Sequence, residues 1–159
     1  MGTGKTETAK ILARRLKRVF LDMDEVIERR QGMPIAEIFK IKGEPFFRSL
    51  EKDLVQELIG RDGLVVSCGG GAFVSDENIE GLKKSGLVVC LSSSPEQILK
   101  RTRGYQHRPL LNVPDPRASI SDLLAKRAPF YAQAHYQLDT DYLTVEETAH
   151  AIIELMKND

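Results

Sequence analysis

The sequence has few of the features that mark secreted, membrane-spanning or nucleic-acid-binding proteins. Its two cysteines, Cys68 and Cys90, stand apart in apolar runs, so we expect two buried thiols in a reducing cytosol. Basic and acidic residues number 23 each, and a net charge of zero gives no bulk attraction for nucleic acid or a membrane surface. No apolar run is long enough to span a bilayer, and the first residues lack the basic-then-apolar pattern of a secretory signal. We therefore expect a cytoplasmic protein without a membrane or nucleic-acid partner.

The chain has the size and composition of one globular domain. It contains 159 residues, of which 42% are hydrophobic and 29% charged. That length is sufficient for a sizeable core, and no repeat or linker divides it. We expect a single domain over 1–159.

Half of a phosphate-binding loop opens the sequence. Gly4-Lys5-Thr6 matches the second half of the pattern G-x-x-x-x-G-K-[ST], in which backbone N–H groups, a lysine and a hydroxyl suit a nucleotide triphosphate and Mg²⁺. The first glycine of the pattern is lacking, and so is the strand that normally leads into such a loop. Since Gly4-Lys5-Thr6 is only three residues long, the alternative is that it matches the pattern by chance and forms a solvated turn.

Apolar periodicity indicates helices that alternate with strands. Helical spacing occurs over 5–17, 24–30, 35–40, 44–59, 75–84, 119–135 and from 94 and 144 onward, and apolar strand-like runs cover 18–22, 63–68, 86–91 and 136–140. Such alternation, with continuous apolar strands, is typical of an α/β fold with a parallel sheet covered on both faces. A possible capping box at Ser119 and Asp122 marks the start of one helix, and Pro129 predicts a distortion within it.

Two acidic residues follow the first predicted strand. Asp22 and Asp24 would lie at the carboxyl edge of the sheet, where α/β proteins bind ligands, and could serve a metal ion and a substrate hydroxyl. The structural alternative makes Asp22 a turn residue and Asp24 the N-cap of the next helix.

Four further features suit an anionic substrate. Arg48 and Glu51 can touch on one helix, either as a surface ion pair or as a carboxylate that orients a substrate-binding arginine. The triple glycine at 69–71 follows an apolar strand, which suits close approach of backbone to a ligand, although a flexible turn is the alternative. Arg108 lies in an irregular basic segment over 103–117 that has the character of a closing lid, and Arg127 is either a second anion anchor or a surface charge.

Taken in order, these segments resemble the shikimate kinase family across nearly the whole chain. The matching segments are Gly2-Thr3-Gly4-Lys5-Thr6, Leu21-Asp22-Met23-Asp24, Ile38-Phe39, Gly43-Glu44-Pro45-Phe46-Phe47-Arg48 with Glu51, Gly69-Gly70-Gly71-Ala72, Arg101-Thr102-Arg103, Arg108-Pro109-Leu110-Leu111 and Arg127-Ala128-Pro129-Phe130-Tyr131. The resemblance implies a three-layer P-loop kinase fold with a parallel sheet of order 2-3-1-4-5 and a mobile lid around 103–117. It implies transfer of the ATP γ-phosphoryl group to the 3-hydroxyl of shikimate, a step of chorismate and aromatic amino-acid biosynthesis, with ATP and Mg²⁺ required. It also suggests a monomer.

The resemblance also implies a role for each matching residue. The nucleotide would be held by Gly2, Thr3, Gly4, Lys5, Thr6, Arg101 and Arg108. Shikimate would contact Asp24, Phe39, Phe47, Arg48, Gly69, Gly70, Gly71 and Arg127. Mg²⁺ would be held by Thr6 and Asp22, and the catalytic residues would be Lys5, Asp24 as candidate base, and Arg108.

One departure from the family lies at the N-terminus. In the order 2-3-1-4-5 the first strand is central, and the sequence before Gly2 does not contain it. We therefore expect this chain to be unstable or inactive. The competing hypotheses are a related small-molecule kinase of the gluconate-kinase type and a truncated, nonenzymatic nucleotide-binding remnant.

Overall fold

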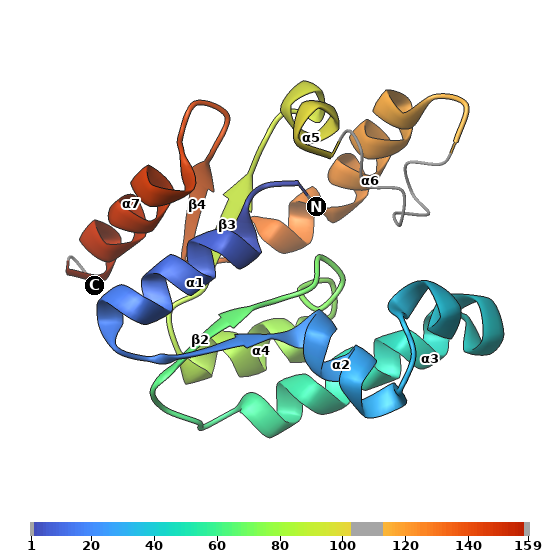
Figure 1. Cartoon of the computed structure of the whole chain (residues 1–159), viewed down its shortest axis with the longest axis horizontal. Coiled ribbons are helices and arrows are strands. Elements are labelled where there is room, and N and C mark those ends of the chain that lie inside the picture. The colour runs from blue at the N-terminus through green and yellow to red at the C-terminus, as the bar shows by residue number, and fades with distance from the viewer. Residues whose placement is uncertain (1, 103–112, 158–159) are drawn as a thin grey trace.

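The computed structural model describes residues 2–102 and 113–157. Helices and strands alternate along the chain, which confirms the predicted α/β class (Figure 1). In chain order the elements are α1 (Lys5–Leu16), β1 (Val19–Asp22), α2 (Met23–Gln31), α3 (Ile35–Leu58), β2 (Leu64–Ser67), α4 (Asp76–Ser85), β3 (Val89–Ser92), α5 (Pro95–Thr102), α6 (Pro116–Tyr131), β4 (Tyr136–Asp139) and α7 (Val145–Lys157).

Glycine conformations explain where two of the helices begin or bend. Gly4 adopts φ 83°, a left-handed conformation that L-residues with side chains rarely take, and α1 begins at the next residue. Gly43 has φ 82° inside α3 and divides it into the two helical pieces that the sequence predicted over 35–40 and 44–59. Glycine therefore sets both the phosphate-loop turn and the bend in the longest helix.

Helix α6 differs from the prediction at both ends. It begins at Pro116 rather than at 119, because the Asp115 side chain accepts a hydrogen bond from the Ala118 N–H and Pro116 is preorganised for the first helical turn. The predicted capping box at Ser119 is therefore wrong, and the last two positions of the loop predicted over 103–117 are helical. The helix runs through Pro129 and ends at Tyr131. The rest of the predicted lid, 103–112 with Arg108, lies outside the described residues.

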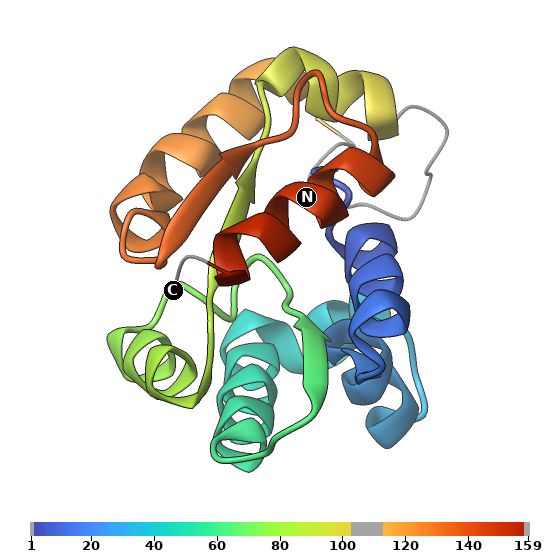
Figure 2. The ribbon, with the colours of Figure 1, turned by 90° about the vertical axis from the view of Figure 1, so that its left-hand side faces the viewer.

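The four strands form two separate parallel pairs. Val19–Asp22 pairs in register with Leu64–Ser67, and Val89–Ser92 pairs with Tyr136–Asp139. No ladder joins β2 to β3 within the described ranges. The turned view separates the two halves, with β3, β4, α5 and α6 above and β2, α3 and α4 below (Figure 2).

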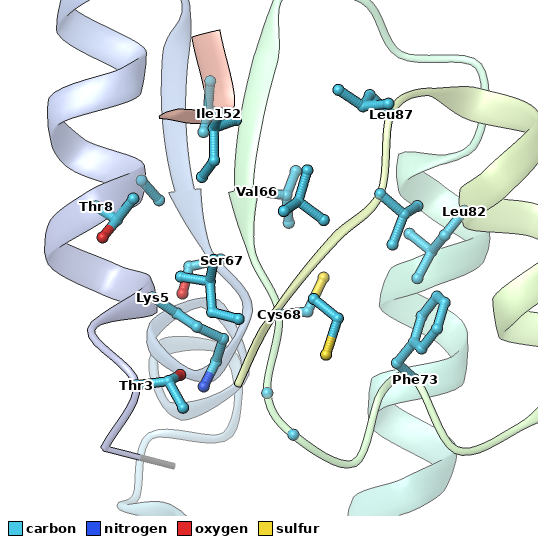
Figure 3. Close-up of a pocket in the computed structure, with 18 of the residues that line it drawn as sticks. Thr3, Lys5, Thr8, Val66, Ser67, Cys68, Phe73, Leu82, Leu87 and Ile152 are labelled. Carbon is cyan, nitrogen blue, oxygen red and sulfur yellow. The ribbon is translucent and has the colours of Figure 1, made fainter. Parts of the chain in front are cut away.

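The buried apolar residues form two clusters. One forms where α2 and α3 cover β1 and β2, around Met23, Ile38 and Leu54, all 2% exposed or less. The other forms where α1 meets α7, around Leu12 and Ile152. Between the pairs lies a cavity of about 980 Å³, here called the central cavity, which is lined along β2 and β3 and by α1, α4 and α6 (Figure 3). Across residues 2–102 and 113–157, no helix combines the length and apolarity needed to cross a membrane.

Candidate active site

The phosphate loop leads directly into the N-terminus of α1. The Thr8 N–H donates to the Gly4 carbonyl, which closes the first helical turn and leaves the earlier N–H groups without partners inside the helix. These N–H groups and the helix dipole favour an anion at this point. Figure 3 shows Lys5 and Thr3 beside one end of the central cavity. The Thr3 hydroxyl is buried without a hydrogen-bond partner among the described residues, so it is free to meet a ligand oxygen.

Asp22 connects this loop to the end of β1. Its Oδ1 accepts from the Asp24 and Glu25 N–H groups, which makes Asp22, and not Asp24, the N-cap of α2. Its Oδ2 accepts from the Thr6 hydroxyl at 2.9 Å. The two residues predicted to hold Mg²⁺ are thus in direct contact.

Ser67 adds an oxygen that the sequence reading missed. Its Oγ lies 3.3 Å from the Thr6 Oγ1. Ser67 ends β2 as Asp22 ends the neighbouring β1, and its position at a strand end was the available signal. Oxygen ligands suit Mg²⁺, which usually takes few ligands from the protein and the rest from water and phosphate. No cluster of three or more His, Cys, Asp or Glu that could hold a metal occurs in the part of the chain that the structure describes.

Asp24 is left free by this capping arrangement. It lies in the first turn of α2 and is half-buried. Burial, followed by the negative charge of Asp22, raises the pKa of the Asp24 carboxyl, and Lys5 opposes that rise. A higher pKa makes a carboxylate a better proton acceptor. The role of Asp24 as a general base stays a prediction.

Arg48 is held by two carboxylates on its own helix. Its Nη1 donates to Glu51 Oε2, and its Nε and Nη2 donate to Glu44 Oε1 at 3.1 and 2.7 Å. Glu51 is only 2% exposed, whereas Glu44 is exposed. Burial raises the pKa of the Glu51 carboxyl, and the hydrogen bond from Arg48 opposes that rise. The pair is therefore more than a surface contact, and Glu51 fixes the position of the guanidinium. That Arg48 binds a substrate stays a prediction.

The two phenylalanines predicted to wall the substrate lie beside Arg48. The ring centroids of Phe39 and Phe47 are 4.9 Å apart, and the Arg48 Cζ lies 5.9 and 5.4 Å from them. Phe47 is 4% exposed and belongs to the core, whereas Phe39 is half-buried. The structure thus places Phe39 closer to solvent than Phe47.

On the other side of the triple glycine, Arg127 and Tyr131 lie one turn apart on α6. The Arg127 Nη1 donates to the Tyr131 hydroxyl at 3.3 Å, and that hydroxyl donates to the Gly70 carbonyl at 2.8 Å. Sequence reasoning included Tyr131 in a motif without giving it a role. The spacing of four residues after Arg127 on one helix was the signal for this contact.

Each glycine of the segment 69–71 packs against a different charged side chain. A Cβ added to Gly69 would lie 2.7 Å from Asp24 Oδ1, one on Gly70 would lie 2.8 Å from Arg127 Nη1, and one on Gly71 would lie 1.7 Å from Arg48 Nη1. Residues with side chains would displace these groups. Three glycines are needed because the backbone passes between Asp24, Arg48 and Arg127, so the segment gathers side chains from α2, α3 and α6.

Arg101 is anchored within the protein. Its guanidinium donates to the Thr140 carbonyl, to the Thr140 Oγ1 at 3.0 Å and to the Ser93 Oγ at 3.3 Å. The Thr140 Oγ1 also lies 3.4 Å from the Thr3 carbonyl, which connects this anchor to the phosphate loop. The contact with the nucleotide predicted for Arg101 stays a prediction.

Comparison with known proteins gives a consistent result. The family model described as "Shikimate kinase" matches residues 1–157. A shikimate kinase of Thermus thermophilus is 46% identical over 97% of this chain and 84% of its own length, and one of Thermodesulfovibrio yellowstonii is 43% identical over 97% and 89%. A solved shikimate kinase of Acinetobacter baumannii, in complex with shikimate, matches with a TM-score of 0.94 and 41% identity over 99% of this chain and 89% of that one. A solved shikimate kinase of Bacteroides thetaiotaomicron matches with a TM-score of 0.89 and 34% identity over 99% and 94%.

Proposed function

Because the chain belongs to the shikimate kinase family, we propose that it transfers the γ-phosphoryl group of ATP to the 3-hydroxyl of shikimate. The observation that supports this most directly is the convergence of Asp24, Arg48 and Arg127 on the triple glycine. A small polyol acid presents one carboxylate and several hydroxyls. Two guanidinium groups suit the carboxylate, and one carboxylate with a raised pKa suits a hydroxyl.

Substrate binding is assigned to the residues around the triple glycine. Arg48 and Arg127 bind the shikimate carboxylate from opposite sides of the segment, and Asp24 accepts a hydrogen bond from the hydroxyl that is phosphorylated. Gly69, Gly70 and Gly71 bring the backbone against the ring, and Phe39 covers an apolar face of it. The close packing of each glycine against one of these side chains supports this assignment.

Phosphate binding is assigned to the loop before α1. The N–H groups from Gly2 to Thr6 and the Lys5 ammonium bind the phosphate oxygens, and the unpaired Thr3 hydroxyl is available to one of them. Arg108 and Arg101 are proposed, from the family resemblance, to close over the phosphates and to lie beside the adenine. The chemistry consists mostly of positioning and charge stabilisation, which this arrangement supplies.

The paired oxygens of Thr6 and Asp22 fit Mg²⁺, and these residues would hold it. Bound there, the ion would neutralise charge on the phosphates. Asp24 takes the proton of the substrate hydroxyl as the new O–P bond forms and the bond to the leaving ADP oxygen breaks.

The finer topology is part of the same proposal. We assign the four strands to a parallel sheet of order 2-3-1-4-5, in which strand 1 is a further strand that precedes β1 in the chain. Strands 2 and 3 of this order are β1 and β2, on one side of strand 1, and strands 4 and 5 are β3 and β4, on the other side. The central position would be taken by a strand that residues 2–102 and 113–157 do not supply. The support is the central cavity between β2 and β3. A chain extended before Met1 by an alternating Val/Thr segment should melt at a higher temperature than one extended by an equal length of Gly/Ser, and equal melting temperatures would count against this strand order.

Activity is tested by coupled detection of ADP release with ATP, Mg²⁺ and shikimate. Family membership leads us to expect ADP release that depends on shikimate in the parent protein, and such release would contradict the expectation, drawn from the N-terminus, of an unstable or inactive chain. The rate should fall at least about 10²-fold in Asp24→Asn, the lower range for loss of a positioned base. ADP release without shikimate, or an unaffected Asp24→Asn, would count against the proposal. The monomeric state and cytoplasmic location stay predictions, and light scattering of the purified protein would decide the first.

A further inference from the structure

A single phenol joins the two parts of the proposed carboxylate site. Tyr131 is the last residue of α6, and its hydroxyl contacts both the Gly70 carbonyl and the Arg127 guanidinium. A phenol has one proton to donate and lone pairs to accept with. The proton is directed to Gly70 at 2.8 Å, and a lone pair meets Arg127 Nη1 at 3.3 Å. Removing that one oxygen therefore breaks both contacts at once.

The hydrogen bond from Tyr131 to the Gly70 carbonyl also fixes the direction of the Gly71 N–H. The Gly70 carbonyl and the Gly71 N–H belong to one planar trans peptide and point in opposite directions. Holding the carbonyl toward Tyr131 therefore holds the Gly71 N–H away from it. Three successive glycines have wide conformational freedom. Two backbone hydrogen bonds constrain the segment, from the Ala72 N–H to the Gly69 carbonyl at 3.1 Å and from the Val74 N–H to the Gly71 carbonyl at 3.3 Å, and neither of them holds the Gly70 carbonyl. The tyrosine supplies a constraint from another element.

The same oxygen limits where Arg127 can lie. The space at the Gly70 Cβ position has Arg127 Nη1 2.8 Å away and the Tyr131 Oη 3.3 Å away, so guanidinium, phenol and backbone meet at one point. Burial raises the pKa of the Tyr131 hydroxyl, and Arg127 opposes that rise. The group therefore stays protonated, and able to donate, across the pH range of an ordinary assay.

We propose that Tyr131 is a positioning residue, which holds Arg127 and the Gly70–Gly71 peptide in the one arrangement that receives the substrate carboxylate. The inference rests on the proposed function, since it assigns a role within the same site. Tyr131 acts through its two partners. Its removal should therefore weaken shikimate binding and leave nucleotide binding unchanged.

The test is Tyr131→Phe, which keeps the ring and removes the hydroxyl. Calorimetric titration should show the Kd for shikimate raised by at least about fivefold to tenfold, the loss expected for the one hydrogen bond between neutral groups, to which the bond from the charged Arg127 guanidinium adds. The Kd for ATP should stay within about twofold of the parent, a change smaller than one such hydrogen bond would cause. Tyr142→Phe is the matched control, because Tyr142 is 94% exposed and lies outside the proposed site. Equal losses for shikimate and ATP would overturn the proposal, because they would indicate a general structural defect.

A double variant separates positioning from packing. In an Arg127→Met background the hydroxyl has lost the group it orients, so adding Tyr131→Phe should change the shikimate Kd much less than it does in the parent. The same fold-change in both backgrounds would overturn the coupling. Failure of the parent protein to bind shikimate would contradict the proposed function itself. Normal binding by both the parent and Tyr131→Phe would contradict only this inference.

Discussion

The Arg48–Glu51 pair offers a sharp test of the site, because one partner is buried and the other is not. Glu51 is 2% exposed, whereas the Arg48 side chain is 30% exposed. Arg48→Met keeps most of the apolar length of the side chain and removes the guanidinium. Glu51 then remains in place, buried and without the hydrogen bond from Arg48.

The expected loss of stability follows from that burial. Breaking a buried ion pair by removing one partner costs about 3–5 kcal/mol, and the partial exposure of Arg48 places this case near the lower end. A loss of about 3 kcal/mol is a large part of a typical domain's total of about 5–15 kcal/mol. For a chain of this size it corresponds to a fall in melting temperature of roughly 6–12 °C.

The loss should also depend on pH, with a defined sign. Burial raises the pKa of Glu51, and Arg48 opposes that rise, so without Arg48 the pKa of Glu51 in the folded protein rises further. The folded variant then binds this proton more tightly than the unfolded chain does. Its deficit should therefore shrink as the pH falls through the raised pKa toward the ordinary range of a glutamate.

Arg30→Met is the matched control for this measurement. Arg30 makes two 2.7 Å hydrogen bonds to Glu57, but both side chains are 48% exposed, so its loss should cost much less stability than the loss of Arg48 at any pH. Urea unfolding of both variants and the parent at several pH values gives the comparison. The reasoning is refuted if the two variants lose the same stability, or if the Arg48→Met deficit does not change with pH.

Four further predictions concern Asp24 and the triple glycine. Asp24→Asn should lower kcat by at least about 10²-fold while the Kd for ATP stays within about twofold, which turnover and calorimetry would separate. Burial and then the charge of Asp22 raise the pKa of Asp24, so the Asp24 carboxyl binds a proton more tightly in the folded protein than in the unfolded chain. The neutral side chain of Asp24→Asn should therefore give a melting temperature equal to or above that of the parent at pH 7. A clear fall in the melting temperature would contradict this. For the same reason kcat of the parent should fall on acidification at a higher pH than an ordinary aspartate would give, and a flat profile down to pH 4 is the contrary result. Gly71→Ala would place a Cβ 1.7 Å from the Arg48 Nη1 and should raise the shikimate Kd about tenfold or more, whereas Gly86→Ala, with nothing within 4 Å, should not.

Local chemistry made several features predictable from the chain alone. The half phosphate loop predicted a nucleotide, and the turn that it requires is present in the left-handed Gly4. Alternating periodicity predicted the α/β class, and Gly43 marked the bend in α3. The predicted start of α6 was wrong because both Asp115 and Ser119 can act as an N-cap. Only the folded chain shows that Asp115 is used.

The roles of Asp22, Arg48 and Glu51 could not be settled locally. A carboxylate at a strand end serves equally well as a cap or as a ligand, and the structure shows one Asp22 oxygen on the α2 N-terminus and the other on Thr6. An arginine and a glutamate one turn apart form a pair on any helix, and only tertiary packing buries Glu51 to 2% exposure.

The sequence by itself determined the residue types, their order and the helical and strand periods, because those depend on short-range spacing. Only the tertiary structure decided that three glycines lie between Asp24, Arg48 and Arg127, since these side chains come from three helices far apart in the chain. It also decided that the Tyr131 hydroxyl reaches Gly70, 61 residues away in sequence. Such contacts depend on how helices pack against the strand ends, and no local sequence pattern predicts which residues far apart in the chain will meet.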